Sequence, residues 1–494
     1  MKKRITAALC VMLFLGSITG CETSSNDGKD AEQAKNDKEV TFVFTKGGFE
    51  NHPDNDAICK KICAAADVKL NHISPPAANY DEKLTLIFSG QEKELPDLAK
   101  IQKSQINKLF DYADQGALMD LTDLVKKCPH ILENVPKEAL DMCTKDGKLW
   151  AIPIWCSPNR MNTIVRKDWL DTLALKEPKT LDEYHDVMKA FTFDDPDGNG
   201  VDDTYGMTGL GMEAIEPYLG AFGVMGVQEN YWYEENGELK PQALNPKARE
   251  ALKVLRDWYK EGIIDPEFSV LKNESELNDK AMKNQFGLTY RWWVWETKIE
   301  GEMKKVDDKV SFERIAPPVG PDGTSGVKGV SMLNGCVVML KNAKNVDACL
   351  RLLDWMHTEE GMMTTYTGVE GVHWKKEGDK YVTLPQFDKD AKWIQWYSAF
   401  ESEWPLLQVE TPLVQSRRDA FKWKTIKNEG DGLVTDAQMR YSTDLTTLIT
   451  DAYTQIITGK KDLSYFNNFA EQWKEKGGAK WSKEINRLYK EKDN

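Results

Sequence analysis

Short apolar runs with the pattern of buried strands alternate with amphipathic helical runs over residues 40–99. The first run, Val40-Thr41-Phe42-Val43-Phe44, is almost wholly apolar, as strands covered on both faces are. Asn79, with Glu82 three residues later, has the spacing of a helix-opening capping box. The predicted strands are residues 40–44, 68–73 and 95–99, and the predicted helices are residues 55–66 and 79–90. This order predicts a parallel sheet covered by helices, and therefore an α/β fold.

Two helices further along the chain have recognisable ends. Thr180 and Glu183 form a capping box, and Asn245-Pro246 places a cap and a first-turn proline before a helix that Gly262 ends. A chain of 494 residues is long enough for two or three domains. We expect a second sheet from residues 205–210, 286–290 and 335–340, which gives two lobes, each a mixed sheet flanked by helices.

The first 20 residues have the three-part layout of a secretory signal. Lys2, Lys3 and Arg4 precede an apolar stretch, and small residues precede Cys21. The segment Ile18-Thr19-Gly20-Cys21 resembles the lipobox of bacterial lipoproteins, which implies cleavage before Cys21 and lipidation of that cysteine. The apolar stretch is shorter than the roughly 20 residues that span a bilayer, so a spanning helix is a poorer interpretation. A plain secretory peptide is the alternative.

Residues 21–39 are polar and contain no aromatic residue, which predicts a flexible linker between the lipid and the fold. We therefore expect a protein tethered through N-terminal acyl chains to the extracellular face of a bacterial plasma membrane. The formal net charge of −14 argues against a nucleic-acid partner, since phosphates favour basic patches. The seven cysteines beyond Cys21 have no zinc-site spacing, and we interpret them as small buried hydrophobes.

An acidic loop follows the helix that begins at Thr180. The segment Asp195-Pro196-Asp197-Gly198-Asn199-Gly200-Val201-Asp202-Asp203 has the spacing of the first part of an EF-hand calcium loop. The predicted Ca²⁺ ligands are the side chains of Asp195, Asp197, Asn199 and Asp203 and the carbonyl of Val201. Gly206 stands at the twelfth position, where a bidentate glutamate would complete the pattern, so another oxygen must serve there. An exposed turn without metal is the alternative.

Aromatic residues gather beside polar ones in three segments of this chain of 16 tryptophans. Sugar rings stack on aromatic planes, while Asn, Arg and Glu side chains bond to hydroxyl groups, so a carbohydrate site needs both kinds of residue. The alternative for each tryptophan is core packing. The predicted ligand-binding residues are Trp155, Asn159 and Arg160, then Arg291, Trp292, Trp293 and Trp295, then Glu370 and Trp374.

Several segments resemble one family, the extracellular solute-binding lipoproteins of ABC importers, in its long carbohydrate-type branch that includes alginate-oligosaccharide binders. The matching segments are residues 80–84, 146–153 (DGKLWAIP), 166–170 (RKDWL), 178–184 (PKTLDEY), 261–265 (EGIID) and 368–374 (GVEGVHW). The resemblance implies a type II fold of two α/β lobes with crossing hinge segments, a structural calcium in the acidic loop, and docking on permease subunits. We place one lobe at residues 40–160 with part of 330–400, and the other at 161–329 with part of 400–494.

We expect capture of an extracellular carbohydrate, with an oligosaccharide as the favoured ligand, by a monomer that has no catalysis of its own. A binder of another solute, such as a peptide or polyamine, stays open. A lipid-anchored glycoside hydrolase is a weaker alternative, because it needs two facing carboxylates and sequence pairs neither Glu296 nor Glu370 with a partner. The chain has no nucleophile elbow, zinc-protease motif or phosphate loop.

Overall fold

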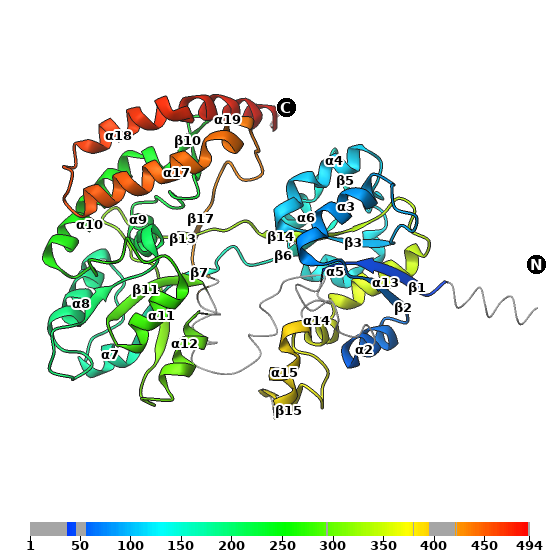
Figure 1. Ribbon diagram of the computed structural model, residues 1–494, viewed down its shortest axis with the longest axis horizontal. Coiled ribbons are helices and arrows are strands. Elements are labelled where there is room, and N and C mark those ends of the chain that lie inside the picture. The colour runs from blue at the N-terminus through cyan, green and yellow to red at the C-terminus, as the bar shows by residue number, and fades with distance from the viewer. Residues whose placement is uncertain are drawn as a thin grey trace, which may run out of the picture.

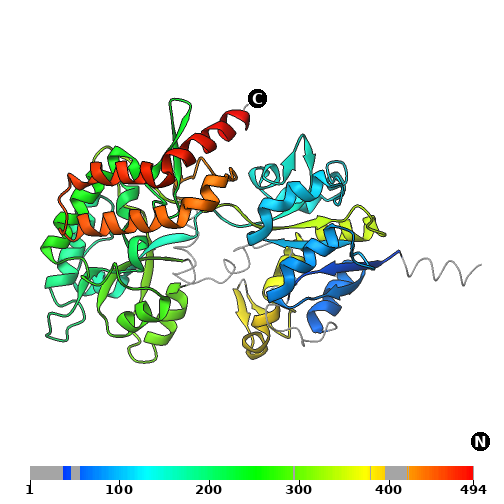
Figure 2. The same cartoon turned by 45° about the horizontal axis from the view of Figure 1, so that its top comes forward.

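The computed structural model describes residues 37–45, 56–292, 295–378, 380–394, 420 and 422–492. Two bodies, each built on its own β-sheet, lie side by side and are joined by segments of the chain that cross between them (Figures 1 and 2). Helices flank both sheets. The predicted two-lobed α/β class is therefore confirmed.

Lobe 1 contains a five-stranded sheet in the order β2-β1-β3-β14-β6. Strand β1 pairs in parallel with β2 and β3, whereas β14 runs antiparallel to β3 and β6. Its strands are β1 (Glu39–Val43), β2 (Lys69–Ile73), β3 (Leu98–Gln102), β4 (Thr144–Lys145), β5 (Lys148–Leu149), β6 (Ile152–Trp155), β14 (Leu333–Met339), β15 (Trp374–Glu377) and β16 (Lys380–Thr383). Its helices are α2 (Ala57–Ala65), α3 (Tyr80–Phe88), α4 (Leu109–Asp114), α5 (Pro129–Asn134), α6 (Lys137–Asp141), α13 (Val346–Met356), α14 (Glu359–Tyr366) and α15 (Pro385–Ile394).

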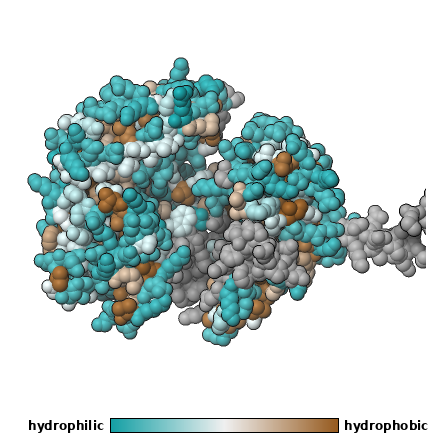
Figure 3. Space-filling model, in the orientation of Figure 1, coloured by the Kyte–Doolittle hydropathy of each residue, from teal (hydrophilic) through white to brown (hydrophobic). Residues whose placement is uncertain are grey.

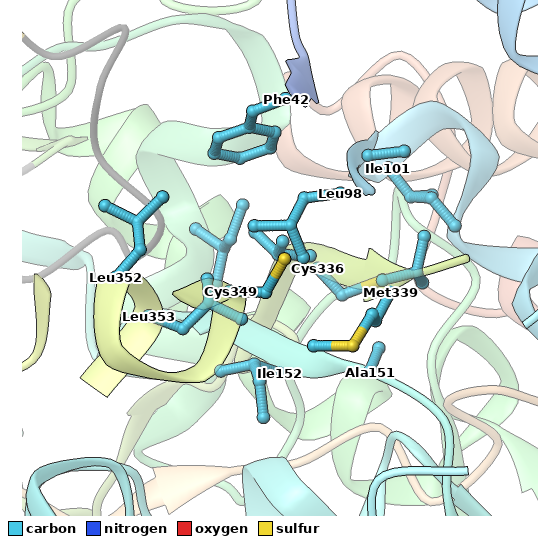
Figure 4. Packing of buried hydrophobic residues seen from close by; sticks show 14 of the residues in the cluster. Phe42, Leu98, Ile101, Ala151, Ile152, Cys336, Met339, Cys349, Leu352 and Leu353 are labelled. Carbon is cyan, nitrogen blue, oxygen red and sulfur yellow. The ribbon is translucent and has the colours of Figure 1, made fainter. Parts of the chain in front are cut away.

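The core of lobe 1 forms where the sheet meets helix α13 and its neighbours (Figure 4). Phe42 of β1, Leu98 of β3, Cys336 of β14 and Leu352 of α13 are each no more than 2% exposed. Burial of one such large apolar side chain stabilises the fold by about 1.5–3 kcal/mol. Strand β14 is buried at nearly every position, as expected of a strand that is covered on both faces.

Lobe 2 contains a four-stranded sheet in the order β12-β7-β11-β8. Strand β7 is central and pairs antiparallel with β11 and β12. Its strands are β7 (Met161–Arg166), β8 (Tyr205–Met207), β9 (Trp232–Glu235), β10 (Glu238–Pro241), β11 (Phe286–Trp292), β12 (Phe312–Ile315), β13 (Val327–Lys328) and β17 (Thr425–Ile426). Its helices are α7 (Lys167–Thr172), α8 (Leu181–Phe193), α9 (Glu216–Gly220), α10 (Pro246–Glu261), α11 (Glu274–Met282), α12 (Trp295–Met303), α17 (Asp436–Ile457), α18 (Tyr465–Trp473) and α19 (Ala479–Lys492).

The C-terminal helices α17, α18 and α19 pack on lobe 2, and Figure 1 shows them along its upper side. One apolar cluster joins Trp232 and Leu252 to Ile449 and Trp473 of these helices. The two sheets thus draw on residues 39–155 with 333–339 and on residues 161–315. The lobe boundaries given above stay predictions.

The helices predicted at residues 79–90, after Thr180 and after Asn245 are confirmed, whereas the capping box at Asn79 and the bounds of one strand are wrong. Thr180 and Glu183 form a reciprocal capping box at α8, and Asn245 caps α10, which Gly262 ends in the left-handed conformation. Asn79, by contrast, makes no capping hydrogen bond, because a single 3₁₀ turn, Ala77–Asn79, runs directly into α3. The predicted strand at residues 95–99 begins instead at Leu98.

The assignment of residues 335–340 to the second sheet is also wrong. Strand β14 lies in lobe 1, between β3 and β6, with Val337 opposite Lys100 and Ile152. Strand β14 pairs with β3 and β6, which lie far away in the sequence. The apolar pattern of residues 335–340 therefore predicts a strand but not the sheet to which the strand belongs.

Two crossing segments between the lobes are hydrogen-bonded to each other. Cys156 N–H donates to the Met332 carbonyl over 2.9 Å, and Val330 N–H donates to the Pro158 carbonyl over 2.9 Å. On the lobe 2 side β13 pairs in parallel with β17, with Val327 opposite Thr425. We define residues 156–160 and 329–332, with strands β13 and β17, as the hinge.

The face of the molecule in Figure 3 is mainly hydrophilic, and a notch separates the two lobes at the top of this view. Within the described ranges, no helix combines the length and the apolar character that crossing a bilayer requires.

Candidate functional site

The paired ends of β7 and β11 meet the hinge, and β11 and the hinge carry four of the predicted ligand-binding residues: Asn159, Arg160, Arg291 and Trp292. Met161 lies opposite Trp292, and Asn162 lies opposite Arg291. Residues that alternate along a strand point to opposite faces of the sheet. The face of Met161 and Trp292 packs with Tyr290 and Met225, while the face of Asn162 and Arg291 is polar.

Arg160 and Trp292 are in direct contact. The guanidinium carbon of Arg160 lies 4.5 Å from the centroid of the Trp292 ring, a cation–π arrangement. Arg160 is buried and Trp292 is half-buried. Asn159, next along the hinge, donates from its amide nitrogen to the Ala420 carbonyl, and its Oδ1 has no partner among the described residues. The structure thus brings Asn159, Arg160 and Trp292 together.

Two buried polar side chains on the opposite face of these strands were not predicted. Asn162 is fully buried, and neither atom of its amide group has a hydrogen-bond partner within the described part of the chain. Thr289, two residues before Arg291, is 3% exposed, and its hydroxyl also has no partner there. An unsatisfied buried polar group costs about 1–3 kcal/mol, so such groups indicate a place where a polar ligand or water binds.

Two acidic residues hold Arg291 in place. Its guanidinium donates to Glu213 Oε1 over 2.9 Å and to Glu274 Oε2 over 3.0 Å. Burial raises the pKa of Glu213, and the Arg291 guanidinium opposes this rise. The two carboxylates therefore balance the positive charge of Arg291 and fix the position of its guanidinium group.

A second group of buried charges attaches the hinge to lobe 2. Lys328 of β13 donates from Nζ to Glu229 Oε1 over 2.6 Å, and its backbone N–H donates to the Tyr290 hydroxyl over 3.3 Å. Glu216 accepts a hydrogen bond from Gly226 N–H over 2.8 Å. Burial raises the pKa of Glu216 to about 7, although the Lys328 ammonium lowers it.

The prediction that Trp295 contacts a ligand is wrong. Trp295 is 1% exposed, and its indole N–H donates to Asn278 Oδ1 over 2.7 Å. Its ring packs 6.4 Å from Phe286 and 5.7 Å from Phe312, measured between ring centroids. The ring belongs to the core because Trp295 begins helix α12 instead of continuing β11. Trp293 and Cys21 lie outside the described residues.

The remaining predicted residues lie in lobe 1. Trp155 ends β6 opposite Leu333 and is half-buried beside the hinge. Trp374 is buried, its indole N–H donates to the Gly368 carbonyl over 2.8 Å, and its ring lies 5.2 Å from that of Tyr381. Glu370 is exposed in the preceding turn. Figure 1 places β15 at the lower end of lobe 1, so the structure does not gather Glu370 and Trp374 with the residues at the hinge.

The acidic loop gathers oxygen atoms of the kind that a hard cation binds. The Asn199 amide nitrogen lies 3.0 Å from Asp197 Oδ2 and 3.4 Å from Asp203 Oδ1, and Gly200 N–H donates to Asp195 Oδ2 over 3.0 Å. Burial, with Asp203 and Asp195 nearby, raises the pKa of Asp197. The donor set fits Ca²⁺ in its chemistry. Over the described ranges, however, no three His, Cys, Asp or Glu side chains form a group ready to hold a metal.

The family model for bacterial extracellular solute-binding proteins matches residues 51–363. The chain belongs to this family. Among relatives, lipoprotein LipO of Bacillus subtilis (strain 168) is 28% identical over 439 residues, covering 84% of this chain and 85% of LipO. The polygalacturonan/rhamnogalacturonan-binding protein YtcQ of the same strain is 25% identical over 511 residues, covering 99% of both chains. Family membership confirms the resemblance found in the sequence.

Solved structures share the fold. A solute-binding protein of Bifidobacterium longum subsp. infantis has a TM-score of 0.69 at 18% identity, covering 92% of this chain and 98% of the other. The alginate-binding protein AlgQ2, solved without calcium ion, has a TM-score of 0.60 at 20% identity with the same coverage. An EF-hand mutant of FusA of S. pneumoniae, in complex with fructo-nystose, has a TM-score of 0.61 at 16% identity, covering 92% and 99%.

Proposed function

We propose that this protein captures an extracellular oligosaccharide between its two lobes and delivers it to the permease of an ABC importer. Family membership supports solute binding, and the carbohydrate-binding relative YtcQ, matched over 99% of both chains, supports a saccharide as the solute. Binding and release suffice for this role, and the site needs no chemical step.

The observation that carries the proposal is the pairing of an aromatic ring, Trp292, with an unsatisfied amide oxygen, Asn159 Oδ1, at the hinge. Trp292, held by Arg160, offers a ring on which the C–H face of a sugar can stack. Asn159, next to Arg160 in the hinge, keeps a buried amide oxygen that lacks a partner among the described residues and can accept a hydrogen bond from a sugar hydroxyl group. Closure follows as a population shift, because a ligand that contacts both lobes stabilises the closed state relative to the open one.

Binding can be tested with a panel of neutral and acidic oligosaccharides in a thermal-shift assay, followed by calorimetry for each hit. A ligand at 100 times its dissociation constant stabilises the folded state by about 2.7 kcal/mol. Asn159→Ala should weaken binding of the hit, with Asn71→Ala in strand β2 as the control. The proposal fails if no saccharide shifts the melting temperature while a peptide or polyamine does. Release of reducing ends from the same panel would favour the hydrolase instead.

The acidic loop holds a structural Ca²⁺ in this proposal. Asp195, Asp197, Asn199 and Asp203 would supply side-chain oxygens, and Val201 its carbonyl. Support comes from the side-chain oxygens that the loop gathers and from the mention of calcium or an EF-hand in the AlgQ2 and FusA structures. Bound calcium would neutralise the clustered carboxylates and fix the segment after α8. A melting temperature that does not respond to chelation would count against the site.

Cys21 provides the membrane attachment in this proposal, through acyl chains at the extracellular face. The sequence around Cys21 and the relative named as a lipoprotein support it. The tether keeps the monomer near its permease.

A further inference from the structure

Two thiols of lobe 1 lie within contact distance on one face of helix α2. Cys59 and Cys63 are separated by one helical turn, and their Sγ atoms are 4.0 Å apart. Neither takes part in a disulfide. Cys59 is buried at 4% exposure, whereas Cys63 is half-buried and open to solvent on one side. The pair plays no part in the proposed sugar site.

Hydrogen bonds favour a thiolate at Cys63. They lower the pKa of its thiol to about 6, chiefly through the bond from Cys59, while burial opposes the change and the backbone N–H of Leu70 adds to it. Leu70 lies in β2, the edge strand of the sheet. Two buried thiols of lobe 1 show the opposite behaviour: burial raises the pKa of Cys128 to about 11 and that of Cys349 further. Cys63 is thus distinct in being both accessible and ionisable near neutral pH.

We propose that Cys59 and Cys63 together bind one soft monovalent cation, Cu(I) or Ag(I), as a two-coordinate dithiolate site. Metal–thiolate bonds are about 2.3 Å long, so two sulfurs on one linearly coordinated ion lie about 4.6 Å apart. The two sulfurs are 4.0 Å apart, so a side-chain rotation that separates them by roughly 0.6 Å would admit the ion. Thiolate ligands select soft cations of this kind. Two sulfur–metal bonds form, with release of one proton when Cys63 is already a thiolate and of two when both groups are thiols, and no electrons are transferred.

The helix disfavours the competing outcome, a disulfide. Residues four apart on a helix have Cβ atoms about 5–6 Å apart, but a disulfide needs about 3.5–4.5 Å. Oxidation would therefore distort the last turn of α2, whereas a bridging ion needs only a small rotation of the side chains. The two thiols cannot hold a harder ion that needs four or more ligands, because no third His, Cys, Asp or Glu completes a metal group within the described residues.

Silver titration of the reduced full-length mature protein in chloride-free buffer tests the proposal. Native mass spectrometry should show one tightly bound Ag⁺, and alkylation of Cys63 should slow at least tenfold when one equivalent is present. Cys63→Ser should weaken Ag⁺ binding at least 100-fold without lowering the melting temperature. Cys128→Ala, which removes a buried protonated thiol, should leave Ag⁺ binding unchanged.

Three results would overturn the proposal. The first is equal Ag⁺ affinity for wild type and Cys63→Ser. The second is loss of the site in Cys128→Ala but not in Cys63→Ser. The third is rapid formation of a Cys59–Cys63 disulfide by a small disulfide oxidant while α2 keeps its amide-exchange protection, because the helix would then tolerate the geometry that we exclude.

Discussion

Glu216→Gln should make the protein more stable at alkaline pH, because Glu216 is a buried carboxyl that the fold keeps from ionising. The side chain is 1% exposed, and burial raises its pKa from the ordinary 4.5 to about 7. Between these two values the unfolded chain loses the proton while the folded chain retains it. The free energy of unfolding therefore falls as pH rises through this window. The difference corresponds to about 3 kcal/mol once pH exceeds 7, at 1.36 kcal/mol per pKa unit.

A glutamine side chain does not ionise, and its amide oxygen can still accept the hydrogen bond that Gly226 N–H now donates to Glu216. Urea unfolding should show Glu216→Gln to be about 3 kcal/mol more stable than wild type at pH 8, but less than about 1 kcal/mol more stable at pH 5. The exposed Glu238 provides the matched control, and Glu238→Gln should give no such pH dependence. The reasoning would be refuted if Glu216→Gln raised the free energy of unfolding equally at both pH values, or did not raise it at pH 8.

Three further predictions concern the site, the loop and the anchor. Trp292→Ala should weaken binding of a saccharide hit at least tenfold in calorimetry, since it removes the stacking plane, whereas Trp150→Ala in lobe 1 should leave the affinity within twofold. Asp197→Asn should abolish the rise in melting temperature that Ca²⁺ gives, whereas Asp194→Asn, outside the ligand positions, should retain it; equal behaviour of the two would contradict the loop assignment. Cys21→Ala should move the protein from the membrane fraction to the medium in cell fractionation, and retention in the membrane would contradict lipid anchoring.

The sequence predicts those elements that local chemistry defines. Thr180 and Glu183 satisfy each other's backbone donors whatever the rest of the chain does, and Gly262 can take a left-handed conformation that most residues avoid. Asn79 has the same apparent signal, but the turn before it already carries the chain into α3. Strand β14 was assigned to the wrong sheet because its neighbours, β3 and β6, come from residues far earlier in the chain.

The site residues also divide into those that the sequence predicts and those that only the structure reveals. Arg160 and Trp292 were both predicted from the association of aromatic and polar residues, and the antiparallel pairing of β7 with β11 brings them into contact. The ligand-binding role predicted for Trp295 does not fit the structure, because helix α12 begins there and places the ring in the core. The tryptophans of this segment give no signal in the sequence that a helix begins. Asn162 was missed, although a lone asparagine within the apolar run Met161-Asn162-Thr163-Ile164-Val165 is itself a signal. A buried strand that retains an amide must satisfy it, inside the protein or with a ligand.

The arrangement of charges suggests which lobe is prepared for ligand before closure. Arg291 is fixed by two carboxylates, and Lys328 ties the hinge strand β13 to Glu229, so both belong to lobe 2 whatever lobe 1 does. The hydrogen bonds of Cys156 and Val330 join the crossing segments to each other on the path towards lobe 1. Rotation between the lobes is then taken up in these segments and not within the paired ends of β7 and β11. We infer that lobe 2 presents a preformed half-site and that closure brings lobe 1 to it. Separating the buried cations of Arg291 and Lys328 from their carboxylates would cost more free energy than turning a short connection.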